Sequence, residues 1–463
     1  MERFDCESWS CAIAYRVVTN SPAWSVAAVQ IVANLSRATL IGRGVRANRL
    51  LLIAFGMTHA GKSLLWAGAD VFTLFVLIKV LHVPPMVAGA LFVLSSFWNA
   101  IVDGIWGQIV NRRAAIRMIL PSVCGSAAAL GCLSFATLPW MPTASMAGTI
   151  FALILFRTTF SLLDVPHNAT AAALTSLHGH LTVARWRSTL SALTAIIVAA
   201  AALPMLGAST AVPHMARIML PGIAILACLL LAPLPWLIRM TCHSTPVSRS
   251  TPAHHNKRSG MRGLAIFCLA QMLGFAALGS IGKAMLHTDA LEGWLFDYVL
   301  LILTVVRLAA VGLWSPLAAL LGSARALSLA YMCSAVAAIT LPAAVGLGAL
   351  SGAVTLSLLG LSLGGVVLLA WASFSEQLAC WGMANDPAAA VRAYGWFTAT
   401  TKVGLGFSGL FTGAWLSHAG DDSLWALWLL VIPVASLCLT SALMAWCRWS
   451  LALRLTPRRF EPA

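Results

Sequence analysis

The chain has 463 residues, of which 60% are hydrophobic and only 9% are charged. Soluble globular domains carry about 25% charged residues, so this composition excludes a soluble protein and indicates a polytopic membrane protein. A membrane span needs about 20 apolar residues, and a chain of this length therefore holds about a dozen spans with short loops. The net charge of +15 at pH 7 fits basic cytoplasmic loops, so we expect no nucleic-acid partner.

Residues 1–49 precede the first long apolar segment. Their one apolar run is too short to span a membrane, and they lack the order of basic, apolar and small residues that marks a signal peptide. We expect a poorly ordered cytoplasmic extension, which translation from a start codon upstream of the natural one would explain. The alternative is an interfacial anchor helix.

Twelve apolar segments follow, near 50–80, 86–110, 115–138, 145–173, 187–208, 217–238, 263–286, 294–320, 325–346, 349–376, 391–417 and 423–449. A basic, Ser/Pro-rich loop at 239–262 divides them into a first half at 50–238 and a second half at 263–450, before a cytoplasmic tail at 451–463. Arg and Lys concentrate before the first segment, in alternate loops and after the last segment. This bias predicts a multi-pass protein of the cell (inner) membrane with both termini in the cytoplasm.

The two halves resemble each other weakly. Gly104 and Trp106 in the second segment correspond to Gly312 and Trp314 in the eighth. In the same register, Asn99 corresponds to Arg307. Such a repeat predicts an all-α integral membrane protein, a twelve-helix major-facilitator bundle of two six-helix halves with a substrate site between them.

Polar residues inside apolar segments are costly, and they therefore mark candidate sites. In the second segment Ser96, Asn99, Asp103 and Gly107 share one helical face. Asp103 should face a cavity or a partner. It is either a proton or cation site or a structural anchor paired with an arginine.

The first segment carries Ser63, Trp66 and Asp70 on one face, with Lys62 beside them. Lys62 and Asp70 lie two turns apart, so each can pair with a different neighbouring helix. A role in binding and a purely structural role are both open for these residues. Trp66, Trp98 and Trp106 are candidates for stacking on a sugar, although membrane tryptophans more often lie at interfaces or in the core.

In the fourth segment Asp164, His167 and Asn168 follow at i, i+3 and i+4, which predicts one patch that faces either the substrate or the protein interior. A loop with His178 and His180 is expected next. Arg187 would then begin the fifth helix and reach polar groups of the fourth helix or a lipid phosphate.

The eleventh segment stacks Tyr394, Thr398 and Lys402 at i, i+4 and i+8. Lys402 lies mid-membrane and needs an acidic partner or a ligand anion. Glu376 in the tenth segment and Arg307 in the eighth are the other conspicuous charges. The chain contains no HExxH, nucleotide-binding glycine loop or CxxC motif, so we expect no enzyme, no metal site and no cofactor.

Three blocks, at 91–112, 162–193 and 394–415, resemble the glycoside–pentoside–hexuronide:cation symporter family, the branch of the major-facilitator fold typified by the melibiose permease. The first block resembles a helix 2 motif with two acids, a glycine and a basic turn. The second resembles a D-x-P element followed by a short polar loop and an arginine, and the third a helix 11 with an intramembrane lysine. The resemblance extends over about 50–450.

The resemblance implies roles for single residues. Asp103 matches the second acid of the family's cation site, and Asp164 and Arg187 match sugar-site residues. Lys402 matches the lysine of helix 11, and Lys62 matches a basic residue of helix 1.

Three positions depart from the family pattern. The first acid of the cation site is Asn99 here, the sugar-binding acid of helix 1 is Ser63, and Asn168 replaces a tryptophan after the D-x-P element. A sodium site needs several hard oxygen ligands, so the lost carboxylate favours proton coupling, or no coupling, over sodium. The lost sugar contacts argue against a galactoside and leave the substrate open.

We therefore predict a secondary active transporter that works by alternating access and carries a glycoside or another small polar solute together with protons. The coupling site would be Asp103 with Asn99, and the substrate would be held by polar residues of four helices: Asp164, Arg187, Lys402, Ser63, Lys62, Asn168 and Thr398. The alternatives are a same-fold exporter of a secondary metabolite, a lysolipid or amphiphile transporter and, in another class, a membrane-embedded enzyme or a non-transporting receptor. The expected partners are the small-molecule substrate and membrane lipid, and we expect a monomer.

Overall fold

The computed structural model describes residues 24–141, 146–206, 212–243, 257–287, 291, 294–380, 387–418 and 424–455. The chain forms two compact units, Met1–Ile53 and Ala54–Ala463. Helix α2 (Trp24–Phe75) begins in the first unit and ends in the second. The predicted extension at 1–49 overlaps this helix from Trp24 on, and its residues 1–23 lie outside the described residues.

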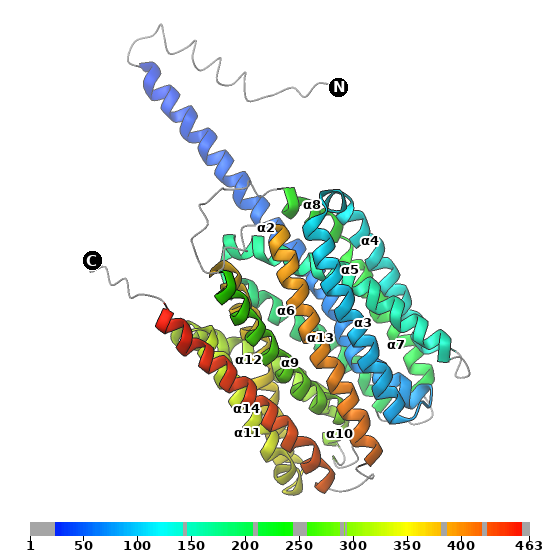
Figure 1. Cartoon of the computed structure of the whole chain (residues 1–463). Coiled ribbons are helices and arrows are strands. Elements are labelled where there is room, and N and C mark those ends of the chain that lie inside the picture. Colours follow the sequence, from blue (N-terminus) through cyan, green and yellow to red (C-terminus); the bar gives the residue numbers. More distant parts are fainter. Residues whose placement is uncertain are drawn as a thin grey trace. The chain divides into compact units, whose positions relative to one another are not determined.

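The second unit is a bundle of long helices, and no strand occurs among the described residues (Figure 1). After α2 and the short π-helix η1 (Val76–Val80), the first half continues with α3 (Pro85–Arg112), α4 (Ala114–Thr137), the 3-10 helix η2 (Leu138–Trp140), α5 (Met146–His178), α6 (His180–Leu206), α7 (Val212–Leu231) and α8 (Leu234–His243). The second half comprises α9 (Lys257–Ala284), α10 (Trp294–Leu321), α11 (Ser323–Gly346), α12 (Ala349–Cys380), α13 (Pro387–His418) and α14 (Leu424–Leu455).

Each of the twelve predicted apolar segments coincides with a helix, and the sixth is divided between α7 and α8. Within the described residues, 11 helices are long and apolar enough to cross a membrane. The eleventh predicted segment, α13, has the length but is not among them, because it carries Arg392, Lys402 and several glycines. The fold is therefore the predicted all-α membrane bundle.

The weak repeat between the halves corresponds to equivalent contacts. Trp106 of α3 donates its indole N–H to the Leu162 carbonyl of α5, with 3.2 Å between the two atoms. Trp314 of α10 donates in the same way to the Leu361 carbonyl of α12, at 2.9 Å. Matched tryptophans thus fasten matched pairs of helices, which supports the register that equates Asn99 with Arg307.

The prediction of a loop with His178 and His180 before Arg187 is wrong. Helix α5 ends at His178 and α6 begins at His180, so Gly179 alone joins them. Gly179 has a φ of +82°, which glycine adopts without the steric cost that a Cβ would add. Because this one residue turns the chain, Arg187 lies about two turns inside α6 rather than at its start.

The halves meet most extensively where α3 runs beside α13 (Figure 1). Glycines allow this close approach: a Cβ on Gly413 would lie 2.6 Å from the Pro85 carbonyl oxygen and 3.1 Å from the Cα of Gly89. The same holds at the other end of the pair, where a Cβ on Gly107 would lie 3.2 Å from the Val391 carbonyl oxygen. The polar stripe predicted on α3 is consequently buried against α13.

Gly413→Ala should destabilise the bundle, because the added methyl group meets backbone atoms that cannot rotate away. Overpacking of this kind costs about 1–3 kcal/mol, so the melting temperature of the detergent-purified protein should fall. The matched control is Gly312→Ala, since a Cβ there meets nothing within 4 Å. Equal melting temperatures for the two variants would contradict the close packing of α3 on α13.

Candidate functional site

A cavity of about 280 Å³ lies between the two halves. Helices α2, α5 and α6 line it from the first half, and α9, α10, α12 and α13 line it from the second. One part of its wall is apolar, with Val198, Leu278 and Val367 among its residues. The polar part carries charged, amide, imidazole and hydroxyl groups: His59, Lys62, Ser63, Asp70, Asp164, Asn168, Arg187, Ser191, Lys283, Thr304, Arg307, Thr398, Thr401 and Lys402.

Lys402 joins the halves at this wall. Its Nζ lies 2.8 and 2.7 Å from the two carboxylate oxygens of Asp103 on α3, and 3.0 Å from Oδ2 of Asp164 on α5. All three side chains are buried, and Asp103 is fully so. Asp103 therefore has the partner that its position requires, and this partner is a lysine of the second half rather than an arginine.

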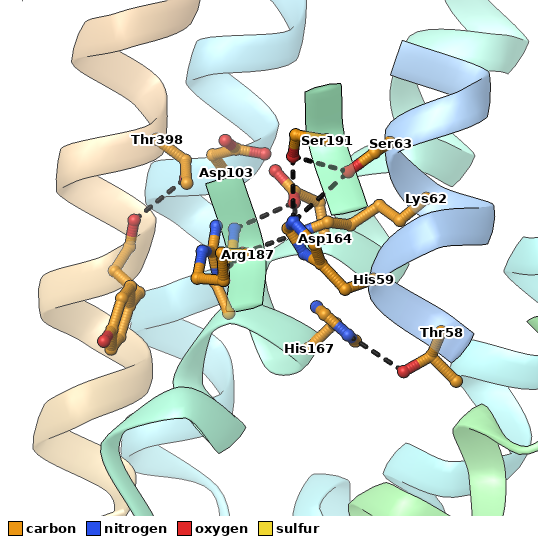
Figure 2. A network of polar contacts seen from close by, with 12 residues as sticks. Thr58, His59, Lys62, Ser63, Asp103, Asp164, His167, Arg187, Ser191 and Thr398 are labelled. Atoms are coloured by element: carbon orange, nitrogen blue, oxygen red, sulfur yellow. Dashed lines mark hydrogen bonds and ion pairs between the residues drawn. The ribbon is translucent and has the colours of Figure 1, made fainter. Parts of the chain in front are cut away.

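Lys62 continues the chain of charges on the opposite side of Asp164. Its Nζ lies 2.9 Å from Oδ1 of Asp164 and 2.5 Å from Oδ1 of Asn168. Asn168 in turn donates its amide N–H to Asp164 at 2.8 Å and accepts a hydrogen bond from Arg187 at 3.1 Å. Figure 2 shows Lys62 and Arg187 approaching Asp164 from different helices. Two carboxylates and two lysines thus form one continuous, charge-balanced network.

Aromatic side chains pack against Arg187 at one side of this network. The guanidinium carbon of Arg187 lies 3.7 Å from the centre of the Trp371 ring on α12, a cation–π contact between the halves. Trp371 stacks on Tyr394 with 6.2 Å between ring centres. Thr398, one turn after Tyr394, lines the cavity, and its hydroxyl donates to the Tyr394 carbonyl.

Hydroxyl and imidazole groups form a second cluster beside Lys62. Nε2 of His59 lies 3.0 Å from the Ser191 hydroxyl and 3.3 Å from the Ser63 hydroxyl, and these two hydroxyls are 3.1 Å apart. The patch predicted on the fourth segment is divided, because His167 turns away from Asp164 to the hydroxyl of Thr58, at 3.0 Å (Figure 2). Only Asp164 and Asn168 of that patch line the cavity.

A second ion pair joins the halves closer to the end of the bundle where α2 passes into η1. Nζ of Lys283 on α9 lies 2.6 Å from Oδ1 of Asp70 on α2. Arg307 of α10 lines the same part of the cavity. Lys62 and Asp70 do pair with different neighbouring helices, as their two-turn spacing predicts.

The structure places seven of the nine predicted site residues at the cavity and two behind its wall. Ser63, Lys62, Asp164, Asn168, Arg187, Thr398 and Lys402 line it, whereas Asn99 and Asp103 do not. Asn99 accepts a hydrogen bond from Ser161 at 2.5 Å. The predicted coupling pair therefore reaches the cavity only through Lys402.

Several residues of the site were missing from the sequence prediction. His59, Ser191 and Trp371 gave no separate signal, because one histidine, serine or tryptophan in an apolar helix is ordinary. Arg157 did give one, since it is a charge in the middle of the fourth apolar segment, and it is buried at 2% exposure beside the rings of Trp66, Phe92 and Phe156. Of the other conspicuous residues, Trp66 lines the cavity, and Glu376 lies outside it and accepts a hydrogen bond from Ser323.

Lys402→Met should leave Asp103 and Asp164 buried without their shared cation. Removing one partner of a buried ion pair costs about 3–5 kcal/mol, so the melting temperature should fall by several degrees. Adding Asp103→Asn to this variant should restore part of the loss. The control is Lys79→Met, which removes an exposed lysine and should leave the melting temperature unchanged; an equal effect of the two lysine variants would contradict the network.

A family model described as MFS/sugar transport protein matches residues 54–423 of the chain. A search of the curated proteins found no match to this chain. Solved structures show the same fold at low identity: the fucose:proton symporter of E. coli has 14% identity and a TM-score of 0.59, with 87% of this chain and 98% of that chain covered. An auto-inhibited POT-family peptide transporter has 14% identity and a TM-score of 0.58, covering 89% of this chain and 99% of that one. A nucleoside transporter has 14% identity and a TM-score of 0.54, covering 88% and 100%.

These structures establish the fold, and the family model establishes the branch. It covers most of the chain, and its matched range contains α3, α5 and α13, whose motifs carry the resemblance seen in the sequence. Together with the charged cavity between two six-helix halves, this places the chain in the sugar-transport family of the major facilitator superfamily, the melibiose-permease-like branch.

Proposed function

We propose that the protein is a secondary active transporter that works by alternating access and carries a sugar or another small polar solute together with a proton. The solute would bind in the cavity between the halves, against Asp164, Lys62, Asn168, Arg187 and Thr398. Asp103 would take up the proton. In this proposal the protein works as a monomer in the cell membrane, with both termini in the cytoplasm and no cofactor.

The single observation that carries the proposal is the position of Lys402. This side chain belongs to the second half, and it binds two carboxylates of the first half, at the wall of the cavity. Motion of one half relative to the other must stretch or exchange these bonds. Coupled transport requires a group that responds both to the charge of the carboxylates and to the contact between the halves. Lys402 interacts with both.

The same position favours a proton over sodium. An ammonium group already lies between Asp103 and Asp164, where a bound cation would otherwise lie. Sodium would have to displace it and would find Asn99 in place of a second α3 carboxylate. A proton needs no such space, since it adds to one carboxylate while Lys402 keeps the other.

The proposed solute is polar because one part of the lining carries buried charged and hydrogen-bonding groups. Carboxylate, amide and ammonium groups at Asp164, Asn168 and Lys62 can exchange hydrogen bonds with hydroxyl groups, and Trp371 and Trp66 line the cavity beside them. The apolar part of the wall would cover the C–H face of a sugar ring or an apolar substituent on it. A lipid substrate would not need this density of buried charge.

Asp103→Asn should abolish proton coupling and keep solute exchange. In proteoliposomes with an inward proton gradient, accumulation of a labelled sugar that binds the purified protein should fall about 10-fold or more, while exchange of internal for external sugar without a gradient continues. The loss follows because an amide cannot take up the proton.

The matched control is Asp297→Asn, an exposed acid in the first turn of α10 and outside the cavity. This variant should accumulate sugar as the unchanged protein does. Gradient-driven accumulation that survives Asp103→Asn at full rate would show that the proton is carried elsewhere or that transport is uncoupled.

A further inference from the structure

A groove of about 820 Å³ lies along the contact between the halves, apart from the central cavity. Its lining comes from α3 and the residue after it in the first half, and from α9 and α13 in the second. The groove and the central cavity share no lining residue. The groove therefore offers a separate surface that both halves build together.

The groove opens to the outside of the bundle, where lipid surrounds a membrane protein. Ile101 and Ile105 on α3 are each 54% exposed, and Trp396 on α13 is 52% exposed. The surface between them is hollow, because a Cβ built on Gly104 would meet nothing within 4 Å. A hollow of this kind gives a lipid acyl chain more van der Waals contact than a convex helix surface does.

Two arginines lie at one end of the groove. Its large apolar residues on α3 repeat at every fourth position from Phe97 to Ile109, and Arg113 occupies the next position of that row. Gln108 and Arg112, one turn apart, end the neighbouring row. Among the described residues that line the groove, none is acidic. The lining is thus apolar over most of its length, polar at Gln108 and cationic at its end.

The length of the groove matches one leaflet of a bilayer. Phe97 and Arg112 are 15 positions apart, which is about 22 Å of helix. A bilayer with its headgroup regions is about 40–45 Å thick, so one leaflet measures about 20–22 Å. When the arginines lie at the level of the headgroups, Phe97 therefore lies near the middle of the membrane. The bias of basic residues predicts that this leaflet is the cytoplasmic one.

The fold itself does not require these two arginines. The last carbonyl groups of α3 are served by Arg117, whose Nη1 donates to two of them, at 3.1 and 3.0 Å. Arg112 and Arg113 are exposed, and neither forms an ion pair with another described residue. The weak repeat does not require them either, because the matched positions of α10 are Leu320 and Leu321. Both guanidinium groups are thus available to a ligand.

We propose that this groove binds an anionic phospholipid. Its phosphate group lies at Arg112 and Arg113, its glycerol ester at Gln108, and an acyl chain along the apolar rows toward Phe97. Arginine binds phosphate through parallel hydrogen bonds, and basic side chains at a membrane surface favour anionic lipids over zwitterionic ones. Because the groove is built from both halves, the bound lipid joins them and stabilises this arrangement. Lipid binding here does not depend on what the central cavity carries.

The test compares two lipids that have identical acyl chains and different net charge. The purified full-length protein in detergent is titrated with phosphatidylglycerol and with phosphatidylcholine. Native mass spectrometry counts the bound lipids, and thermal shift measures how far each lipid stabilises the protein. The first phosphatidylglycerol molecule should bind about 10-fold more tightly than the first phosphatidylcholine molecule, since two arginines favour the anionic headgroup.

Replacing both arginines tests the cationic end of the groove. Arg112→Gln combined with Arg113→Gln should bring the two lipids to within about threefold of each other, whereas the two Arg→Lys changes should retain part of the preference. The matched control combines Arg185→Gln with Arg239→Gln. It removes two exposed arginines outside the groove and should keep the full preference.

Filling the groove tests its apolar part. Gly104→Leu places a branched side chain in open space, so the lipid-free protein should melt no lower, and the first phosphatidylglycerol molecule should bind about 10-fold or more weakly. The matched control is Gly312→Leu on α10. A Cβ at this equivalent glycine also meets nothing within 4 Å, and the position lies outside the groove, so lipid binding should not change.

Three lipid-binding results would overturn the inference: equal binding of the two lipids, a preference that survives the loss of both arginines, or undiminished binding by Gly104→Leu. A second copy of the chain in the groove would overturn it as well. In that case Ile105→Cys, in a cysteine-free background and in phosphatidylglycerol liposomes, would form a disulfide-linked dimer much faster than Leu313→Cys, which is exposed on α10. We expect equal, slow cross-linking of the two cysteine variants.

Discussion

The arrangement of this protein depends on one buried ammonium group. Lys402 lies between Asp103 and Asp164, at 2.7–3.0 Å from their oxygens, in the interior of a membrane bundle. None of the three charges is tolerable there alone, because the cost of burying an unpaired charge exceeds what local packing can offset. The two halves therefore hold each other's charges, and the glycine contacts between α3 and α13 allow the backbones to approach closely enough for this.

In the proposed function, the shared lysine connects packing to transport. A carboxylate that gains a proton releases its hold on Lys402, while the other carboxylate keeps the lysine neutralised. The contact between the halves can then change without leaving a bare charge in the membrane. The second inter-half pair, Asp70 with Lys283, lies nearer the end of the bundle, where parting of the halves would break it. The cavity lies between these two connections.

The sequence was enough to predict the fold and most of the charged cavity residues, because both depend on local patterns. The lengths of the apolar segments predicted the helices. Asp103, Asp164 and Lys402 were predicted as site residues because a charge inside an apolar segment is energetically costly. The sequence could not predict which charges pair, since Asp103 and Lys402 are 299 residues apart and any of the buried acids could have been the partner of Lys402. The single-residue turn at Gly179 was missed because polar residues around it imitate a loop, and His59 and Ser191 were missed because neither is unusual in a helix.

The most direct test of the account is the distance between the halves as a function of pH. Spin labels at exposed positions His82 and Leu347, and in a second sample at Arg113 and Leu320, report on the two ends of the bundle in a cysteine-free background. Lowering the pH should shift both distance distributions, in opposite directions, and Asp103→Asn should fix them at one setting. Distributions that do not respond to pH, or that respond equally in the Asp103→Asn variant, would contradict a coupling role for the Lys402 network.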